Sequence, residues 1–348
     1  MYGAPVSAAD PPQLGGKHAI WLFAFGYFAC YVPYSALTKA LSKGVFPGLA
    51  NPIHGPTLLP IATLTSLTVM LIFLTVMGWW KHANQRTIAG RSLPFPTRWT
   101  ALSGLCTSAI LTTTTLAYTF DGVSIVFVML LMRGGVLILA PMVDALTGRR
   151  TRWFSWIGLG LSFMSLLVAF AEEGGYLITA ACALDIGLYL TAYFIRLRFM
   201  SRLAKSDDRQ ATLRYFVEEQ LVATPATMVM LVAAAAVGQG PFMGQVRAGF
   251  VHLPSAVILP TILVGALSQG TGIFGTLVFL DKSENTFSVP VNRSSSILAG
   301  VCASTLLAVL VGLPMPSSHE LAGAGLVLLA IVVLTLGPTL EKRRAKTS

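Results

Sequence analysis

The sequence predicts an all-α integral membrane protein with ten transmembrane helices arranged as two inverted five-helix repeats. Its 348 residues are 54% hydrophobic and only 11% charged, with a mean hydropathy of +0.71, which is too apolar for a soluble domain of this length. The apolar residues gather in windows of about 20, long enough to cross a bilayer. Two of these windows carry an arginine near their middle, about 160 residues apart.

The apolar windows are separated by charges, prolines or glycines, and each is taken as one span. Residues 1–16 show no basic segment ahead of an apolar core, so the first span itself is expected to direct insertion. The predicted spans are 18–38, 57–80, 99–119, 123–145, 153–171, 175–196, 213–237, 256–280, 286–311 and 321–340.

The basic residues predict the orientation of these spans. With a cytoplasmic N-terminus, 19 of the 24 lysines and arginines fall on inner segments, and only Lys39, Lys43 and Arg247 fall on outer ones. All six tryptophans lie near inner ends of spans, where an interfacial belt is expected. Both termini are therefore predicted to be cytoplasmic. A cell inner (plasma) membrane is favoured over an organelle membrane.

A weak internal repeat supports two halves. Residues 102–118 align without a gap on residues 263–279, which matches Gly104 with Gly265 and Thr115 with Thr276. An odd number of spans in each half would insert the halves in opposite orientations. The predicted divisions are a cytoplasmic tail at 1–17, a first five-helix repeat at 18–196, a basic linker at 197–212, a second repeat at 213–340 and a tail at 341–348.

Several short stretches resemble the drug/metabolite transporter superfamily, whose members have ten spans built as two inverted repeats called EamA domains. The turn at 148–150 differs, because the family commonly carries an acidic residue there. The stretches that carry the likeness are Thr115-Leu-Ala-Tyr118, Leu131-Met-Arg-Gly-Gly-Val136, the basic turn and Trp/Gly pattern of 148–158, Arg293-Ser-Ser-Ser-Ile-Leu-Ala-Gly300 and the Gly-rich segment 320–329.

The resemblance extends to a possible substrate class. Sugar-phosphate and nucleotide-sugar transporters of this superfamily are similar in placing basic residues on the fourth and ninth helices, facing a central cavity, to hold a phosphate. Arg133 and Arg293 match those positions. The resemblance therefore implies a carrier that moves a small organic anion through alternating access.

The two arginines also point to an anion by their own chemistry. A guanidinium in the middle of a span costs roughly 2.5 to 3.5 kcal/mol, so something must compensate it. A guanidinium holds its N–H donors in a fixed planar arrangement, so two of them can bind a phosphate or a carboxylate between them. The alternative is that Arg133 and Arg293 form structural ion pairs with intramembrane acids, in a carrier that exports neutral or amphipathic metabolites, amino acids or lipid-linked sugars. A non-transporting membrane scaffold is a second alternative.

Other polar residues within the spans complete the predicted site. Asp185 lies on a polar stripe of the sixth span with Tyr189 and Arg196, and it is a candidate proton-coupling group or a fixed counter-ion. Glu218 and Glu219, near the start of the seventh span, are further coupling candidates. The residues expected to line the substrate site beside the arginines are Tyr27, Tyr31, Tyr118, Thr115, Asn292 and Gln269.

The sequence offers no motif for catalysis, a cofactor or a metal. The four cysteines lie in apolar stretches without CxxC spacing, and the five histidines fall at span ends or in loops. The net charge of +10 sits in loops rather than in a patch for nucleic acid. The expected partners are a small anionic molecule, a coupling proton or counter-substrate, and the lipid bilayer.

Overall fold

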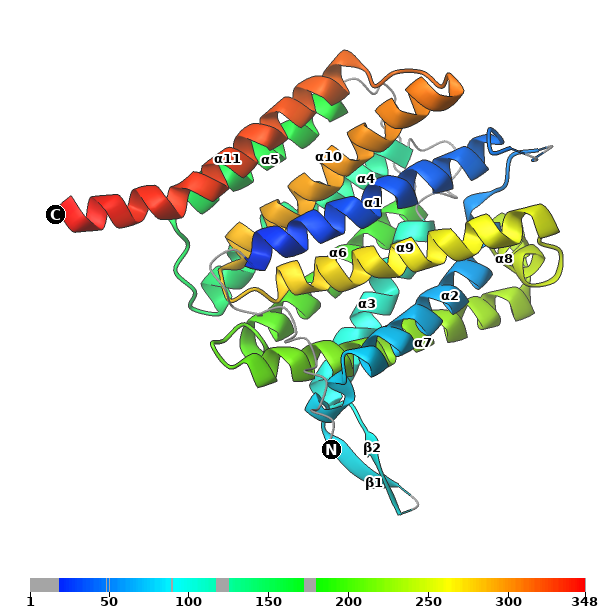
Figure 1. Ribbon diagram of the computed structural model, residues 1–348, viewed down its shortest axis with the longest axis horizontal. Helices are drawn as coiled ribbons and strands as arrows, with labels where there is room; N and C mark the ends of the chain where they lie inside the picture. Colours follow the sequence, from blue (N-terminus) through cyan, green and yellow to red (C-terminus); the bar gives the residue numbers. More distant parts are fainter. Residues whose placement is uncertain are drawn as a thin grey trace, which may run out of the picture.

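The computed structural model describes residues 19–47, 49, 51–88, 90–116, 125–171 and 180–347. These residues form eleven α-helices, one 3-10 helix (η1) and one antiparallel hairpin (Figure 1). The elements are α1 (Ala19–Lys43), α2 (Gly55–Val76), η1 (Trp79–His82), β1 (Gln85–Ile88), β2 (Arg91–Pro94), α3 (Arg98–Leu116), α4 (Ile125–Leu146), α5 (Trp153–Phe170), α6 (Ala180–Leu203), α7 (Arg209–Val237), α8 (Gly240–Val251), α9 (Ser255–Phe279), α10 (Asn285–Val311) and α11 (Ser318–Thr347).

Local sequence signals set several helix ends. Pro56 occupies the first turn of α2, where its missing N–H costs nothing. The Asp208 carboxylate caps α7 by accepting a hydrogen bond from the Gln210 N–H at 2.8 Å. Gly238 and Gly312 end α7 and α10 in the left-handed region, at φ values of 63° and 70°.

The structure confirms an all-α protein with membrane-spanning character. Among the described residues, seven helices are long and apolar enough to cross a membrane, namely α1, α2, α6, α7, α9, α10 and α11. A count of ten spans remains a prediction. The short helix α8, between α7 and α9, was not predicted, because its twelve residues are too few for a span.

The helices pack side by side in one bundle (Figure 1). The paired helices α5 and α11 form one edge, α1 packs between α9 and α10, and α2 and α7 lie at the opposite edge. The glycine pair from the internal repeat makes two close helix contacts. A Cβ atom on Gly104 would lie 2.7 Å from the Glu219 carbonyl oxygen on α7, and one on Gly265 would lie 2.4 Å from the Ala62 carbonyl oxygen on α2. Only glycine allows these approaches.

Some predicted divisions need correction. The range 18–196 holds α1 to α5 and most of α6, so it contains six helices and not five. A division into five and five long helices requires a boundary between α5 and α6, in a segment outside the described residues. The helix α11 runs on to Thr347, through the predicted C-terminal tail. The predicted tail at 1–17 lies outside the described part of the chain.

Candidate functional site

The arginine of α10 lies in an aromatic setting. Arg293 is 7% exposed, and its Nη2 donates a long hydrogen bond of 3.5 Å to the Tyr189 hydroxyl on α6. Its guanidinium carbon stands 5.1 Å from the centre of the Tyr193 ring, a cation–π distance. Its Nε is buried and has no hydrogen-bond partner among the described residues. Arg293 therefore retains one donor for a further acceptor.

Arg133, the arginine of α4, also contacts a tyrosine, in this case on α1. Arg133 is partly buried, and its Nη2 donates to the Tyr31 hydroxyl on α1 at 3.4 Å. The Tyr31 ring packs against Tyr27 with 5.4 Å between ring centres. Both arginines interact electrostatically with Tyr27 and with Tyr189. The two guanidinium groups thus belong to one cluster, the Tyr–Arg cluster, made of Arg133, Arg293, Tyr27, Tyr31, Tyr189 and Tyr193.

Three ion pairs join described residues to one another, and Arg293 is in none of them. These pairs are Arg152 with Glu284, Arg196 with Glu219, and Lys282 with Asp207. Asp185 also stands outside them. Its side chain is 5% exposed, and within the described structure neither of its carboxylate oxygens has a hydrogen-bond partner. Arg293 and Asp185 are therefore not neutralised by each other.

Other predicted site residues lie at varying distances from the cluster. Asn292 is buried on α10, and its amide and the Tyr27 ring both approach the backbone of Gly275 on α9. Gln269 is buried on the same α9, two turns before Gly275, without a described contact to either arginine. Thr115 lies in α3 with no described side chain, and Tyr118 is outside the described residues.

The two glutamates of α7 are fully buried and well supplied with donors. Glu218 accepts hydrogen bonds from the backbone N–H groups of Asn84 and Thr97, both at 3.0 Å, and from the Thr100 hydroxyl at 2.6 Å. It therefore ties the start of α3 to α7. These contacts give Glu218 a structural role in this conformation, and its predicted coupling role remains untested.

Glu219 forms a bidentate ion pair with Arg196 of α6, with N–O distances of 2.8 and 3.1 Å. The Ser103 and Thr107 hydroxyls of α3 donate to the same carboxylate at 2.8 and 3.0 Å. Arg196 also donates to the Thr276 hydroxyl of α9 at 3.1 Å. The pair thus joins four helices, and its charges are satisfied within the protein.

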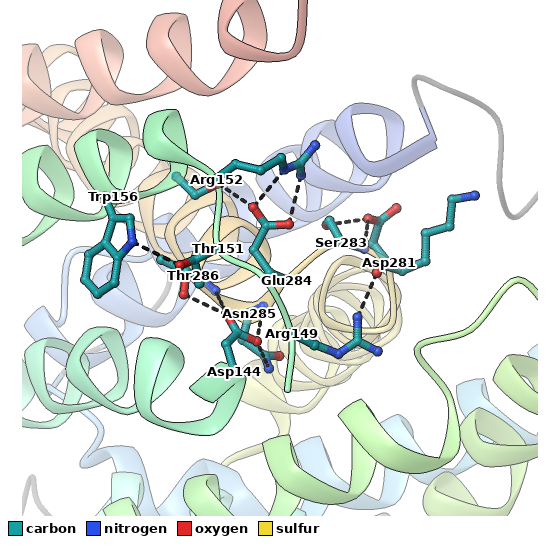
Figure 2. Close-up of polar contacts among 12 residues, drawn as sticks. Asp144, Arg149, Thr151, Arg152, Trp156, Asp281, Ser283, Glu284, Asn285 and Thr286 are labelled. Atoms are coloured by element: carbon teal, nitrogen blue, oxygen red, sulfur yellow. Dashed lines mark hydrogen bonds and ion pairs between the residues drawn. The ribbon is translucent and has the colours of Figure 1, made fainter. Parts of the chain in front are cut away.

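A second polar cluster closes one end of the helix bundle (Figure 2). We call this end of the bundle the basic end. Figure 2 shows the contacts between the α4–α5 and α9–α10 connections, and further hydrogen bonds link both to the end of α6 and the α6–α7 connection. The Asp144 carboxylate, at the end of α4, accepts from the backbone N–H groups of Asn285 and Thr286 at 2.9 and 2.7 Å. Asp144 therefore caps the first turn of α10 from a different helix.

Arginines of the α4–α5 connection strengthen this closure. Arg152 holds Glu284 through two hydrogen bonds of 2.9 and 3.0 Å. Although burial disfavours the carboxylate, the hydrogen bonds from Arg152 and Ser155 keep the pKa of Glu284 below its ordinary value. Arg149 donates to the backbone carbonyl groups of Lys282 at 2.9 Å and Ser201 at 3.1 Å. The closure thus fixes α10 to α4, α5 and α6.

Lys205 is the buried lysine of this basic end. Its Nζ donates to the Ser283 carbonyl oxygen at 3.0 Å and to the Ser288 hydroxyl at 2.9 Å. Burial lowers the pKa of Lys205 to about 8, and nearby Asp144 offsets only part of that effect.

Sequence reasoning found the arginines but missed part of the site. Tyr193 was not predicted as a site residue, although Tyr189-x-x-x-Tyr193 on α6 repeats the Tyr27-x-x-x-Tyr31 spacing of α1 at an offset of 162. That repetition was the available signal. The roles of Asp144 and Asn285 had no comparable signal, because they depend on which connections meet in space.

The comparisons with known proteins identify a fold and nothing finer. No family model matches the chain, and no curated protein matches it either. A solved structure named "Crystal structure of protein" is similar, with a TM-score of 0.60 and 16% identity. That similarity covers 92% of this chain and 98% of the other chain. At this identity the likeness shows a shared fold alone.

Proposed function

We propose that this protein is a secondary transporter that moves a small organic anion, bearing a phosphate or a carboxylate, across a membrane by alternating access. The Tyr–Arg cluster is its anion site, with Arg133 and Arg293 as the clamp. The resemblance to EamA-type drug/metabolite transporters, which rests on short motifs, agrees with this proposal.

The observation that carries the proposal is the state of Arg293. A buried structural arginine normally has its charge balanced by a carboxylate, as Arg196 has with Glu219. Arg293 instead meets tyrosines, and among the described residues its Nε has no partner. Burying that cation costs free energy, which a bound anion would recover through charge-assisted hydrogen bonds.

The arrangement of the cluster supports two inverted halves. One half supplies Tyr27 and Tyr31 on α1 with Arg133 on α4, and the other supplies the matching tyrosine pair on α6 with Arg293 on α10. The packing repeats in the same way, since α1 contacts α9 and α10 while α6 contacts α3 and α4. An anion between the halves would meet one guanidinium from each, which is the expected place for a substrate site in such carriers.

Alternating access then assigns a role to the basic end. Under the positive-inside rule this end faces the cytoplasm, so the closure around Asp144 and Glu284 would seal the cytoplasmic side in this conformation. Release of the anion to that side requires α10 to separate from α4 and α5. Asp185, whose carboxylate is buried with no hydrogen-bond partner among the described residues, is proposed as the group that exchanges a proton during this cycle.

The decisive experiment measures stability and anion affinity on the same samples. Arg133→Ala and Arg293→Ala should each insert and fold, yet bind a phosphate-bearing probe such as glycerol 3-phosphate roughly ten- to a hundredfold more weakly, because one charge-assisted contact contributes about 1.5 to 3 kcal/mol. Lysine variants should bind the probe more tightly than the alanine variants and more weakly than wild type, since lysine keeps the positive charge but lacks the planar set of guanidinium donors. A dicarboxylate and a neutral hexose, tested in parallel, would rank the anion classes.

Arg196→Ala is the matched control, because it removes an arginine that already has a carboxylate partner. It should lower the melting temperature strongly and reduce the amount of folded protein. If Arg293→Ala behaved like this control and kept wild-type affinity for all probes, the anion-clamp proposal would be wrong and the arginine would be structural.

A further inference from the structure

A groove lies on the outside of the bundle beside the α4–α5 connection, and no residue of the Tyr–Arg cluster lines it. Its volume is about 480 Å³, within the range of small-molecule sites. It is lined by Ile138, Pro141, Met142, Ala145, Arg149, Thr151 and Trp156. The first four residues follow a helical spacing of three or four, so they form one face of α4.

The apolar part of this groove faces the surroundings of the bundle. Ile138 is 53% exposed and Met142 48% exposed. Pro141 lies within α4 and removes one backbone hydrogen bond there, which favours a local bend. This part of α4 belongs to the predicted span 123–145, where the surface would meet lipid chains, so an acyl chain is the apolar group available to fill it.

The other end of the groove is positively charged. Arg149, Arg150 and Arg152 fall within four residues of the α4–α5 connection. Arg152 is neutralised by Glu284, and Asp144 is a carboxylate neighbour of Arg149. The exposed Arg150 adjoins the groove-lining Arg149 in the chain and forms no ion pair with another described residue.

Trp156 marks the level of the membrane interface at this place. Its side chain is 49% exposed, and its indole N–H donates to the Thr151 hydroxyl at 3.0 Å (Figure 2). Tryptophan with one polar end prefers the headgroup region of a bilayer. The groove thus runs from the apolar interior to a cationic turn at headgroup level.

We infer that this groove binds one anionic phospholipid of the cytoplasmic leaflet, with an acyl chain along α4 and the phosphate at Arg149 and Arg150. The chemistry matches at both ends, since anionic headgroups gain from a juxtamembrane arginine and the chain gains from apolar burial. Because Arg149 also donates to the Ser201 and Lys282 carbonyl groups, the bound lipid stabilises the closed basic end.

The test uses delipidated full-length protein in detergent, titrated with phosphatidylglycerol or phosphatidylcholine. Native mass spectrometry counts bound lipid, and the melting temperature follows the stabilisation that binding produces. Wild-type protein should retain one phosphatidylglycerol in preference to phosphatidylcholine. Arg150→Gln should weaken phosphatidylglycerol binding about fivefold, since one surface arginine contributes about that factor. Ala145→Trp, which fills the groove, should abolish the melting-temperature shift for both lipids.

Two variants serve as matched controls. Arg202→Gln removes another exposed arginine close to the basic end, and Ala183→Trp enlarges another exposed alanine on a span. Both should bind lipid like wild type, and all four variants should melt like wild type before lipid is added. Equal retention of the two lipids by wild-type protein would overturn the inference, and so would wild-type phosphatidylglycerol binding by Ala145→Trp.

Discussion

Buried charges in this protein are of two kinds, and the difference lies in their partners. Arg196 and Glu219 satisfy each other, and hydroxyl groups from two further helices complete the pair. Arg293 keeps an unpartnered donor, and Asp185 keeps two unpartnered oxygens within the described structure. The paired charges hold helices together, whereas the unpaired ones cost free energy unless a ligand or a proton compensates them.

The buried ion pair of Arg196 and Glu219 predicts an effect on the stability of the fold. Glu219→Ala should lower the free energy of unfolding by about 3 to 5 kcal/mol, because it leaves the buried Arg196 guanidinium without its carboxylate. Denaturant unfolding in detergent measures this loss. The double variant Arg196→Met with Glu219→Leu should recover much of the stability, since no charge then remains buried. A single Glu219→Ala variant with wild-type stability would contradict this assignment.

The unpaired acid predicts an effect on transport. If Asp185 exchanges a proton in each cycle, Asp185→Asn should abolish the pH dependence of uptake into proteoliposomes, while anion binding at high concentration stays largely intact. Uptake of the same anion probe across a pH series measures this. A folded Asn variant with unchanged pH dependence would instead assign Asp185 a purely structural role.

At the scale of elements, the start of α10 decides how the basic end is held. Its first two N–H groups are capped by Asp144 from α4, and its preceding residue Glu284 is held by Arg152 beside α5. Opening of this end must break both sets of contacts together. The closure is therefore expected to behave as one cooperative unit.

Lys205 gives this closure a pH dependence whose sign is defined. Burial lowers the pKa of Lys205 from its ordinary value of 10.5 to about 8, so between these values the unfolded chain binds more protons than the folded one. Stability must then rise with pH across this window, by up to about 1.4 kcal/mol per pH unit for one proton. Unfolding from about pH 7.5 to 10.5 measures the slope, which should disappear in Lys205→Met.

The matched control for this slope is Lys282→Met, which alters an exposed lysine of the same end of the bundle. Because the Lys282 side chain is largely in solvent, this variant should keep the rise in stability with pH. A slope that survives in Lys205→Met would show that another group titrates in this window.

The sequence predicted the long helices well and their connections poorly. Apolar windows mark spans because the bilayer demands them, and the central arginines stand out because a buried charge is expensive. The helix α8 is too short for a span pattern, and the β1–β2 hairpin lies in a polar connection without alternating apolar residues. The cap on α10 joins residues about 140 positions apart, so only the fold reveals it.

At the scale of the whole molecule, residues that correspond in the two predicted repeats make corresponding helix contacts. Gly104 allows α3 to approach α7, and Gly265 allows α9 to approach α2. The tyrosine pairs of α1 and α6 likewise flank the arginines of α4 and α10. These two sets of corresponding contacts are what the predicted pair of repeats, related by a half-turn, would produce.

Inverted halves make a topological prediction that parallel halves do not. The α2–α3 connection carries Ser92, and the equivalent connection after α7 carries Gln239, both exposed. In a variant whose four cysteines are replaced, Ser92→Cys should react with an impermeant maleimide only from the cytoplasmic side, and Gln239→Cys only from the opposite side. Sealed right-side-out and inside-out vesicles provide the two tests. These exposed positions lie outside the helices, so the substitutions should leave folding and transport intact. Labelling of both positions from the same side would rule out the inverted arrangement, because equivalent connections of inverted halves must lie on opposite faces of the membrane.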